Sequence, residues 1–366
     1  MNNIGLYIHI PFCDGKCPYC DFYSLRADEK RMDDYTEAVI RSLSDYSRKL
    51  NRTADTLYFG GGTPNLIGAE RLSAIVSAAK SGFGLQNAEI TVEVNPAREL
   101  DRFFEEIYKA GVNRLSVGLQ SASDEELKQL GRRHTAEQAS EAVAAAQQAG
   151  FHNVSLDLML AVQGQTQQSL FNSIQFCAKQ NIQHVSAYLL KIEPGTNYYR
   201  KRDELDLPGE DAASDLYLFA VRELEKAGFA QYEISNFARE NYESRHNLKY
   251  WHDGEYLGIG PAAHSFVNGK RFYYGRDLQA FLDGTEPTQD GTGGSFEEYA
   301  MLALRLNEGL TESGCQNRFE MPIPQEIAQR AKKYEKVGLT VCDENGIRFT
   351  PNGFLVSNTL IGEILF

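Results

Sequence analysis

Three of the six cysteines lie close together in the chain, in the pattern Cys13-x3-Cys17-x2-Cys20. Thiolates at such spacing hold a metal ion or an iron–sulfur cluster, or they form a redox pair. Structural zinc commonly takes two C-x2-C pairs, and this chain has no second pair. A thioredoxin-like redox pair would leave Cys13 without a role. The spacing therefore favours an iron–sulfur cluster with one iron not bound by the protein, while zinc and redox chemistry stay open as alternatives.

Alternating strand-like and helix-like segments surround this loop and must position it. This alternation is typical of a parallel sheet with helices packed outside it, so the fold class is α/β. Six units predict an open partial (β/α)6 barrel or a doubly wound sheet, and in both the chemistry gathers at the carboxyl ends of the strands. The cysteine loop, the glycines at 60–62 and residues 95–96 all follow predicted strands. The strands are predicted at 6–10, 56–59, 89–94, 114–117, 154–158 and 185–190, and the helices at 33–50, 69–79, 99–110, 136–149 and 167–179.

The pattern changes after about residue 200, which predicts three parts of the chain. Residues 1–200 form the α/β unit, residues 201–290 an extension rich in glycine and aromatic residues, and residues 296–366 a small C-terminal α+β domain. The Gly/Thr/Pro-rich segment 283–295 predicts a linker. Predicted helices at 296–306 and 327–337, followed by strands at 341–343 and 347–350 that pair across Asn345–Gly346, give the last part a winged-helix-like pattern.

Charge and hydropathy narrow the range of partners. The chain has 50 acidic and 37 basic residues, a formal net charge of −13, which argues against a nucleic-acid partner. No apolar run reaches the roughly 18 residues of a transmembrane segment, and the N-terminus lacks the pattern of a secretory signal. We therefore expect a cytoplasmic protein. Transient contact with a membrane, or with a second copy of the chain as a homodimer, stays open.

The segment from Tyr7 to Cys20, Tyr-Ile-His-Ile-Pro-Phe-Cys-x3-Cys-Pro-Tyr-Cys, resembles the radical S-adenosylmethionine (SAM) enzymes. More narrowly, it resembles the oxygen-independent coproporphyrinogen III oxidase group, and further blocks at 60–64, 93–96, 116–120 and 155–158 extend the resemblance over essentially the whole chain. The resemblance implies a partial radical SAM barrel in which Cys13, Cys17 and Cys20 hold a 4Fe-4S cluster and SAM chelates the open iron. An electron donor would reduce the cluster, and cleavage of the sulfonium would give a 5′-deoxyadenosyl radical.

The same resemblance implies which residues contact SAM. Arg132 suits the methionine carboxylate, although the adjacent Arg133 offers the same chemistry. After Asp157 the chain departs from the Gly-Leu-Pro-like turn of the family, so no ligand role is assigned to residues 160–164. The positions that match SAM contacts of the family are Tyr7, Tyr19, Gly61, Gly62, Thr63, Glu93, Gln120, Arg132 and Asp157.

Two features indicate the haem-chaperone branch of this group. The oxidases carry a further cysteine two residues after the third one, and here that position is Phe22. The block His246-Asn-Leu-Lys-Tyr250-Trp251 matches the branch's H-N-x-x-Y-W haem motif. It implies His246 as the ligand of the haem iron, with Tyr250 as the fallback ligand and Trp251 packing on the porphyrin. A hydrogen-bonded core histidine beside packed aromatic residues is the structural alternative.

Three functions therefore stay open. The favoured function is a haem chaperone that delivers haem to recipient haemoproteins and retains the radical SAM machinery. The second is an oxygen-independent coproporphyrinogen III oxidase, whose activity we expect to be absent. The third is a regulator whose C-terminal domain binds another protein. Whether the protein is an enzyme at all depends on whether it uses SAM cleavage.

Overall fold

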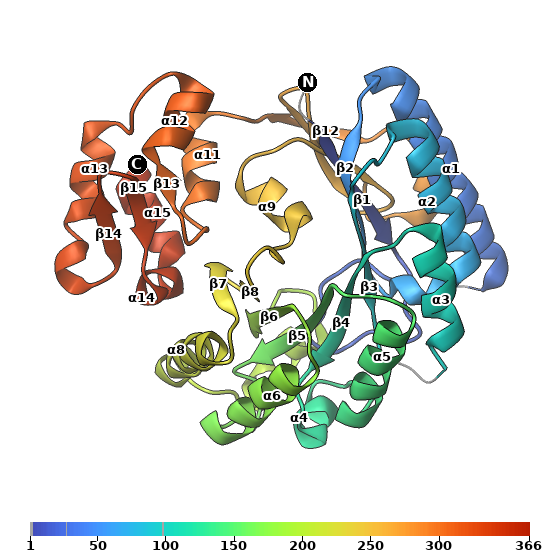
Figure 1. Ribbon diagram of the computed structural model, residues 1–366, viewed down its shortest axis with the longest axis horizontal. Coiled ribbons are helices and arrows are strands. Elements are labelled where there is room, and N and C mark those ends of the chain that lie inside the picture. The colour runs from blue at the N-terminus through green and yellow to red at the C-terminus, as the bar shows by residue number, and fades with distance from the viewer. Residues whose placement is uncertain (1–2, 27, 97–98) are drawn as a thin grey trace.

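The computed structural model describes residues 3–26, 28–96 and 99–366. Its first half is a curved parallel sheet in which each strand pairs with the next one in the chain (Figure 1). All six predicted strands are present, which confirms the α/β class and the partial-barrel arrangement. The strands are β1 (Ile4–Ile10), β2 (Ala54–Gly61), β3 (Glu89–Val94), β4 (Arg114–Gln120), β5 (Val154–Leu160) and β6 (His184–Leu189).

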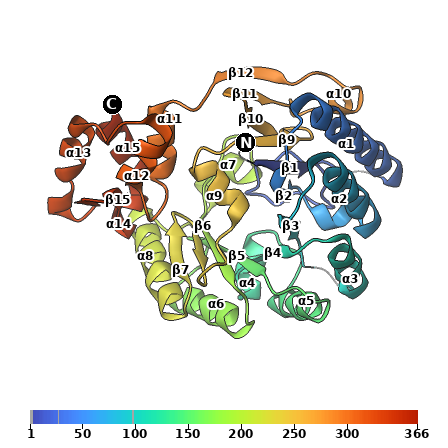
Figure 2. The same ribbon diagram turned by 45° about the horizontal axis from the view of Figure 1, so that its top comes forward.

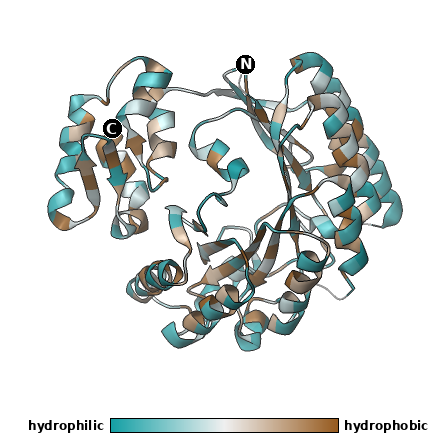
Figure 3. Ribbon diagram, viewed as in Figure 1, coloured by the Kyte–Doolittle hydropathy of each residue, from teal (hydrophilic) through white to brown (hydrophobic). Residues whose placement is uncertain are grey.

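Helices cover the outer face of this sheet, and their outward surfaces are largely hydrophilic (Figure 3). The first helix begins at Glu29 rather than at residue 33, because the Asp28 side chain accepts a hydrogen bond from the backbone N–H of Arg31 and caps the helix. The outer helices are α1 (Glu29–Leu50), α2 (Ala69–Phe83), α3 (Asp101–Ala110), α4 (Asp124–Gln129), α5 (Ala136–Gln148), α6 (Gln167–Lys179) and α8 (Glu210–Lys226). Short helical turns lie at η1 (Pro64–Ile67), α7 (Asn197–Arg200) and η2 (Arg202–Glu204).

The second half of the chain extends the sheet on both sides, to twelve strands within the residues that the structure describes. Next to β1 lies the parallel strand β9 (Tyr256–Ile259), followed by antiparallel β10 (His264–Val267), β11 (Lys270–Tyr273) and β12 (Thr288–Thr292), with α10 (Leu278–Leu282) before β12 (Figure 2). At the other edge, β8 (Asn236–Ala238) pairs antiparallel with β6, and β7 (Ala230–Glu233) pairs with β8. The predicted linker 283–295 therefore contains an edge strand, whose five residues are all exposed and lack an apolar pattern.

The C-terminal residues form a separate sheet of three strands, in the order β13-β15-β14. The expected hairpin is present as β14 (Thr340–Asp343) and β15 (Gly346–Phe349). The second expected helix is shorter, because α13 (Gln325–Lys332) gives way to η3 (Glu335–Val337). The remaining elements are α11 (Phe296–Ala303), β13 (Leu310–Thr311), α12 (Glu312–Phe319), α14 (Pro351–Leu355) and α15 (Ser357–Leu365). Across the described ranges, no helix is long and apolar enough to cross a membrane.

Candidate cofactor site

The three clustered cysteines lie in the loop that follows β1. All three are free and half-buried, unlike the fully buried Cys177 and Cys315. Backbone hydrogen bonds from Leu25 to Pro11 and from Cys13 to Leu25 hold the loop against the end of β1. The sulfur of Cys13 lies 3.3 Å from the hydroxyl oxygen of Thr63, which follows β2. The loop thus presents its thiols beside the carboxyl ends of neighbouring strands.

The thiols do not converge on one point. Within the described part of the chain, no set of three His, Cys, Asp or Glu side chains is grouped tightly enough to hold a single metal ion. A 4Fe-4S cluster does not require this, because each cysteine sulfur binds a different iron atom. Three free, partly exposed thiols on one tethered loop therefore suit a cluster better than they suit zinc.

The side chains of the adjacent Arg132 and Arg133 lie in different environments. The Arg132 guanidinium points at the cysteine loop, with its nitrogens 3.6 Å from the Cys17 sulfur, 2.7 Å from Asn95 Oδ1 and 3.1 Å from the carbonyl oxygen of Gly118. The Arg133 side chain is 64% exposed and forms an ion pair with Asp14 at 3.0 Å. Only Arg132 therefore offers its charge to the inner side of the loop.

Glycines leave room next to the cysteine loop. Gly61 has a φ of +105°, and a Cβ atom at this position would lie 2.6 Å from the His9 ring. A Cβ atom at Gly62 would lie 2.5 Å from the carbonyl oxygen of Phe12. Larger residues are therefore excluded at both positions, and the backbone after β2 stays accessible at close range.

Two carboxyl groups lie deeper in the barrel. Glu93 Oε1 accepts a hydrogen bond from the Tyr58 hydroxyl at 2.8 Å, and Asp157 Oδ1 accepts one from the Ser116 hydroxyl at 3.0 Å. Burial, together with the nearby charge of Asp157, raises the pKa of Glu93 to about 7. Burial also raises the pKa of Asp157. A buried carboxyl group with acceptor capacity suits hydroxyl ligands.

The other predicted SAM contacts lie around the same space. Gln120 ends β4 with a φ of +69°, and Thr63 accepts a hydrogen bond from the Asn95 side chain at 2.9 Å. The Tyr19 ring packs against Tyr198, with 6.2 Å between the ring centroids. Tyr7 projects from β1 beside the Tyr58 ring. The predicted positions thus lie along or just after β1 to β5, with Tyr7 and Asp157 in mid-strand and Tyr19 and Arg132 in the loops that follow.

The H-N-x-x-Y-W motif forms α9 (Arg245–Trp251), which lies inside the curve of the sheet (Figure 1). Its His246 ring is 1% exposed, with Nδ1 2.8 Å from the Thr56 hydroxyl and Nε2 2.7 Å from the Tyr250 hydroxyl. Burial lowers the pKa of His246 to about 3, so the ring is neutral. In this arrangement neither ring nitrogen is free to bind iron. The half-buried Trp251 ends the helix.

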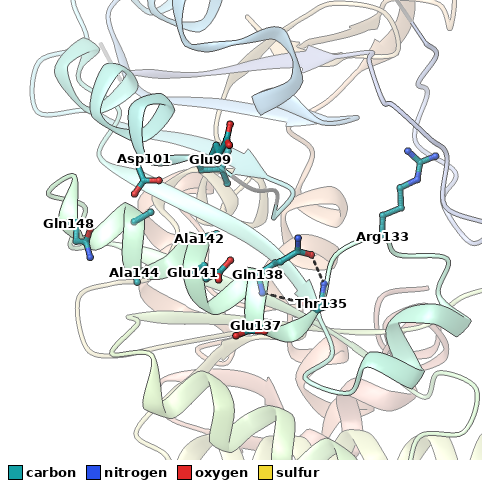
Figure 4. Close-up of a pocket in the computed structure, with 12 residues that line it drawn as sticks. Glu99, Asp101, Arg133, Thr135, Glu137, Gln138, Glu141, Ala142, Ala144 and Gln148 are labelled. Atoms are coloured by element: carbon teal, nitrogen blue, oxygen red, sulfur yellow. Dashed lines mark hydrogen bonds between the residues drawn. The ribbon is translucent and has the colours of Figure 1, made fainter.

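Two cavities are lined by residues described above. One, of about 540 Å³, is lined by Tyr7 and Tyr250 and also by His264 and Arg276, which the sequence analysis did not identify. The signal for His264 is weak, since it is a single histidine after the small-residue run 258–263. The other, of about 860 Å³, lies along α3 and α5 of the outer layer. Carboxylates line this second cavity, and Figure 4 shows Arg133 apart from them, so its charge does not suit an anionic ligand.

The comparison with known proteins agrees with this geometry. Residues 7–177 match the Radical SAM superfamily, which implies a 4Fe-4S cluster and SAM as cofactors. The fold is that of coproporphyrinogen III oxidase HemN from Escherichia coli, with a TM-score of 0.85 at 22% identity over 99% of this chain and 90% of that one. The half-barrel with its cysteine loop is thus a radical SAM fold.

Closer relatives define the family. Proteins named haem chaperone HemW are 31% identical in Bacillus subtilis, over 98% of both chains, and 38% identical in Escherichia coli, over 72% of this chain and 70% of the relative. The relative of that name in Mycobacterium tuberculosis H37Rv is 35% identical over 84% of this chain and 82% of its own. The chain belongs to this HemW family of radical SAM proteins, which confirms the family resemblance.

We expect His246 to contribute to stability. The change His246→Ala removes a buried ring and leaves the Thr56 and Tyr250 hydroxyls without these partners, so the free energy of unfolding should fall by about 2–4 kcal/mol. Chemical denaturation followed by circular dichroism measures it. His252→Ala is the matched control: this exposed histidine pairs with Glu308 at the surface, and its loss should cost about 0–1 kcal/mol. Equal stability of the two variants would contradict a structural role for His246.

Proposed function

We propose that the protein is a haem chaperone that binds haem and transfers it to recipient haemoproteins, while it keeps a working cluster and SAM site. The observation that carries the proposal is Phe22. This side chain stands where the oxidases of the group have a further cysteine, is 63% exposed, and lines the 540 Å³ cavity together with tyrosines. An exposed aromatic ring at a cavity suits a flat apolar ligand. The name of the HemW relatives supports the same function.

Within this proposal, Cys13, Cys17 and Cys20 hold the cluster. Their tethered loop, their partial exposure and the Arg132 guanidinium 3.6 Å from the Cys17 sulfur favour a role as cluster ligands over that of buried, inert cysteines. When bound, the cluster supplies one electron for cleavage of the SAM sulfonium bond. The protein's own residues position the cofactor and limit the access of water to it.

The resemblance to the radical SAM enzymes implies the SAM contacts, and the polar groups around the loop are compatible with them. We assign the methionine carboxylate to Arg132, the ribose hydroxyls to Glu93, and the close backbone approach to Gly61 and Gly62. Thr63, Gln120 and Asp157 complete the polar wall, and Tyr7 and Tyr19 form its aromatic sides. The part of the chain up to residue 200 would thus hold the cluster and SAM. Residues 201–290 would contribute to the haem site, and residues 296–366 would form the C-terminal domain.

The first test concerns the cluster. Cys17→Ala should abolish loading with iron and sulfide under anaerobic conditions, because one of three protein ligands is lost. Cys342→Ala is the matched control, since Cys342 is also free and half-buried but lies in β14, outside the loop. The measurements are the iron content, the sulfide content and the visible absorbance of the cluster. Full loading of the Cys17 variant would overturn the assignment.

The second test concerns SAM. Arg132→Ala should weaken SAM binding to the loaded protein by about 1.5–3 kcal/mol, because a charged hydrogen-bonded contact is lost. Arg133→Ala should leave the affinity unchanged, since its guanidinium pairs with Asp14 at the surface. Anaerobic calorimetry on both variants gives the comparison. If only the Arg133 variant loses affinity, the carboxylate contact belongs to that residue.

The third test separates chaperone from oxidase. The purified protein should bind hemin and restore the absorbance of an apo-haemoprotein, because the aromatic cavity offers a site for haem. Under anaerobic reducing conditions with SAM, it should leave coproporphyrinogen III unchanged. The oxidase function predicts instead that the substrate is consumed, with formation of carbon dioxide and methionine. Turnover without haem transfer would reverse the proposal.

A further inference from the structure

The 540 Å³ cavity has the size and lining of a site for a flat aromatic ligand. Its volume lies within the roughly 300–1,000 Å³ typical of ligand pockets. Tyrosines contribute much of the wall, from β1, from the loop after the cysteines, from α9, from β9 and from the end of β11. Planar rings of this kind pack on a macrocycle by stacking and edge contacts. Tyrosines in the wall include Tyr7, Tyr23, Tyr250, Tyr256 and Tyr273.

Two histidines line this cavity, and they differ in what they can bind. The His9 ring is 4% exposed, and its two nitrogens are hydrogen-bonded to the Tyr7 hydroxyl at 3.1 Å and to the Tyr23 carbonyl at 2.9 Å. His264 is exposed at the start of β10, and its ring nitrogens have no hydrogen-bond partner among the residues that the structure describes. An imidazole with a free nitrogen is a ligand for haem iron, and of the two histidines in this wall His264 is the one that meets this requirement.

The neighbouring strand fixes the orientation of His264. His264 and Tyr273 are register partners in the antiparallel pair β10–β11, and their rings stack with centroids 5.1 Å apart and an interplanar angle of 25°. Stacking on Tyr273 restricts the imidazole while both nitrogens stay free. An iron-binding side chain on a pair of antiparallel strands is positioned by the backbone hydrogen bonds of the sheet, which hold it more firmly than a loop would.

Two cationic side chains lie in or beside the wall of this cavity. Arg276 lines the cavity, is 60% exposed in its side chain, and pairs with Asp21 at 3.0 Å. The Arg276 guanidinium carries further donors for a second carboxylate. Lys16 donates to the backbone carbonyl of Phe22 at 3.0 Å, which places a second positive charge next to the same lining residue. A net-acidic protein thus presents two cations beside this cavity.

We propose that this cavity is the haem site, that His264 binds the haem iron, and that Arg276 binds a propionate. The inference rests on the proposed haem-chaperone function and names the site and the iron ligand for it. It assigns the H-N-x-x-Y-W motif a positioning role. Tyr250 lines the cavity, and the buried His246 ring is hydrogen-bonded to the Tyr250 hydroxyl.

Hemin titration of the full-length protein and its variants tests the inference. His264→Ala should shift the Soret band and the spin state of the haem iron, and should lower the affinity for hemin roughly tenfold or more, because the iron loses its nitrogen ligand. Free imidazole should restore the wild-type spectrum to a His264→Gly variant. His246→Gln, which keeps hydrogen-bonding groups at this position, should retain the wild-type spectrum. His252→Ala, an exposed histidine outside the cavity, should behave as the wild type.

Iron-free protoporphyrin IX separates ligation from packing. His264→Ala should bind it as the wild type does, because this ligand has no iron to coordinate, whereas Arg276→Ala should bind both porphyrins more weakly without a change in the iron spectrum. If the wild-type protein transfers haem but His264→Ala leaves the haem spectrum unchanged, this inference is overturned while the proposed function stands. Equal loss of both porphyrins in that variant would also overturn the ligand role. A wild-type protein that binds no hemin would contradict the proposed function itself.

Discussion

Parallel pairing of β1 on both of its sides is the interaction on which the rest of the site depends. Tyr7 lies opposite Tyr58 of β2 on one side and Gly258 of β9 on the other. Since β1 has hydrogen-bonded neighbours on both sides, its carboxyl end is fixed in direction and height. The cysteine loop starts from this end of β1. Because β9 is parallel to β1, the chain leaves β9 toward β10 at the same edge of the sheet. One strand therefore aligns the cluster loop with the cavity that contains His264.

The inner face of this sheet is filled by α9 rather than by apolar side chains alone. The buried Glu89 carboxylate accepts hydrogen bonds from the backbone N–H groups of Arg245 and His246, at 3.1 and 3.0 Å. These are the unpaired donors of the first helical turn, so the carboxylate at the start of β3 anchors the helix. His246 then reaches Thr56 of β2, which ties the helix to a second strand. A short helix that would not be stable alone is held in this way inside the barrel.

The sequence predicted the cysteine loop and the six strands because each depends on local spacing and periodicity. The strand-end positions of Thr63 and Glu93 followed from the parallel fold and the resemblance, without any distance being known. For His246 the sequence offered two interpretations, an iron ligand and a hydrogen-bonded core histidine, and it could not decide between them. The decisive partner, Thr56, lies on another element almost two hundred positions away in the chain. His264 was missed for a similar reason. Its exposure to the cavity arises from the pairing of β10 with β11, and a single histidine in a sequence does not report such a register.

A continuous set of rings joins the proposed SAM wall to the proposed haem cavity. Glu93 holds the Tyr58 hydroxyl, the Tyr58 ring stacks on His246 at 5.1 Å between centroids, and His246 packs on Tyr250 at 4.9 Å. Tyr250 in turn packs on Tyr256, at 4.5 Å, and both line the cavity. Packed interiors have low compressibility and transmit strain, so these ring contacts form a physical connection between the two proposed sites. By linkage, any effect of SAM on haem affinity must equal the effect of haem on SAM affinity. If His264 binds the haem iron as proposed, the H-N-x-x-Y-W motif lies between the two proposed sites and positions Tyr250 through His246.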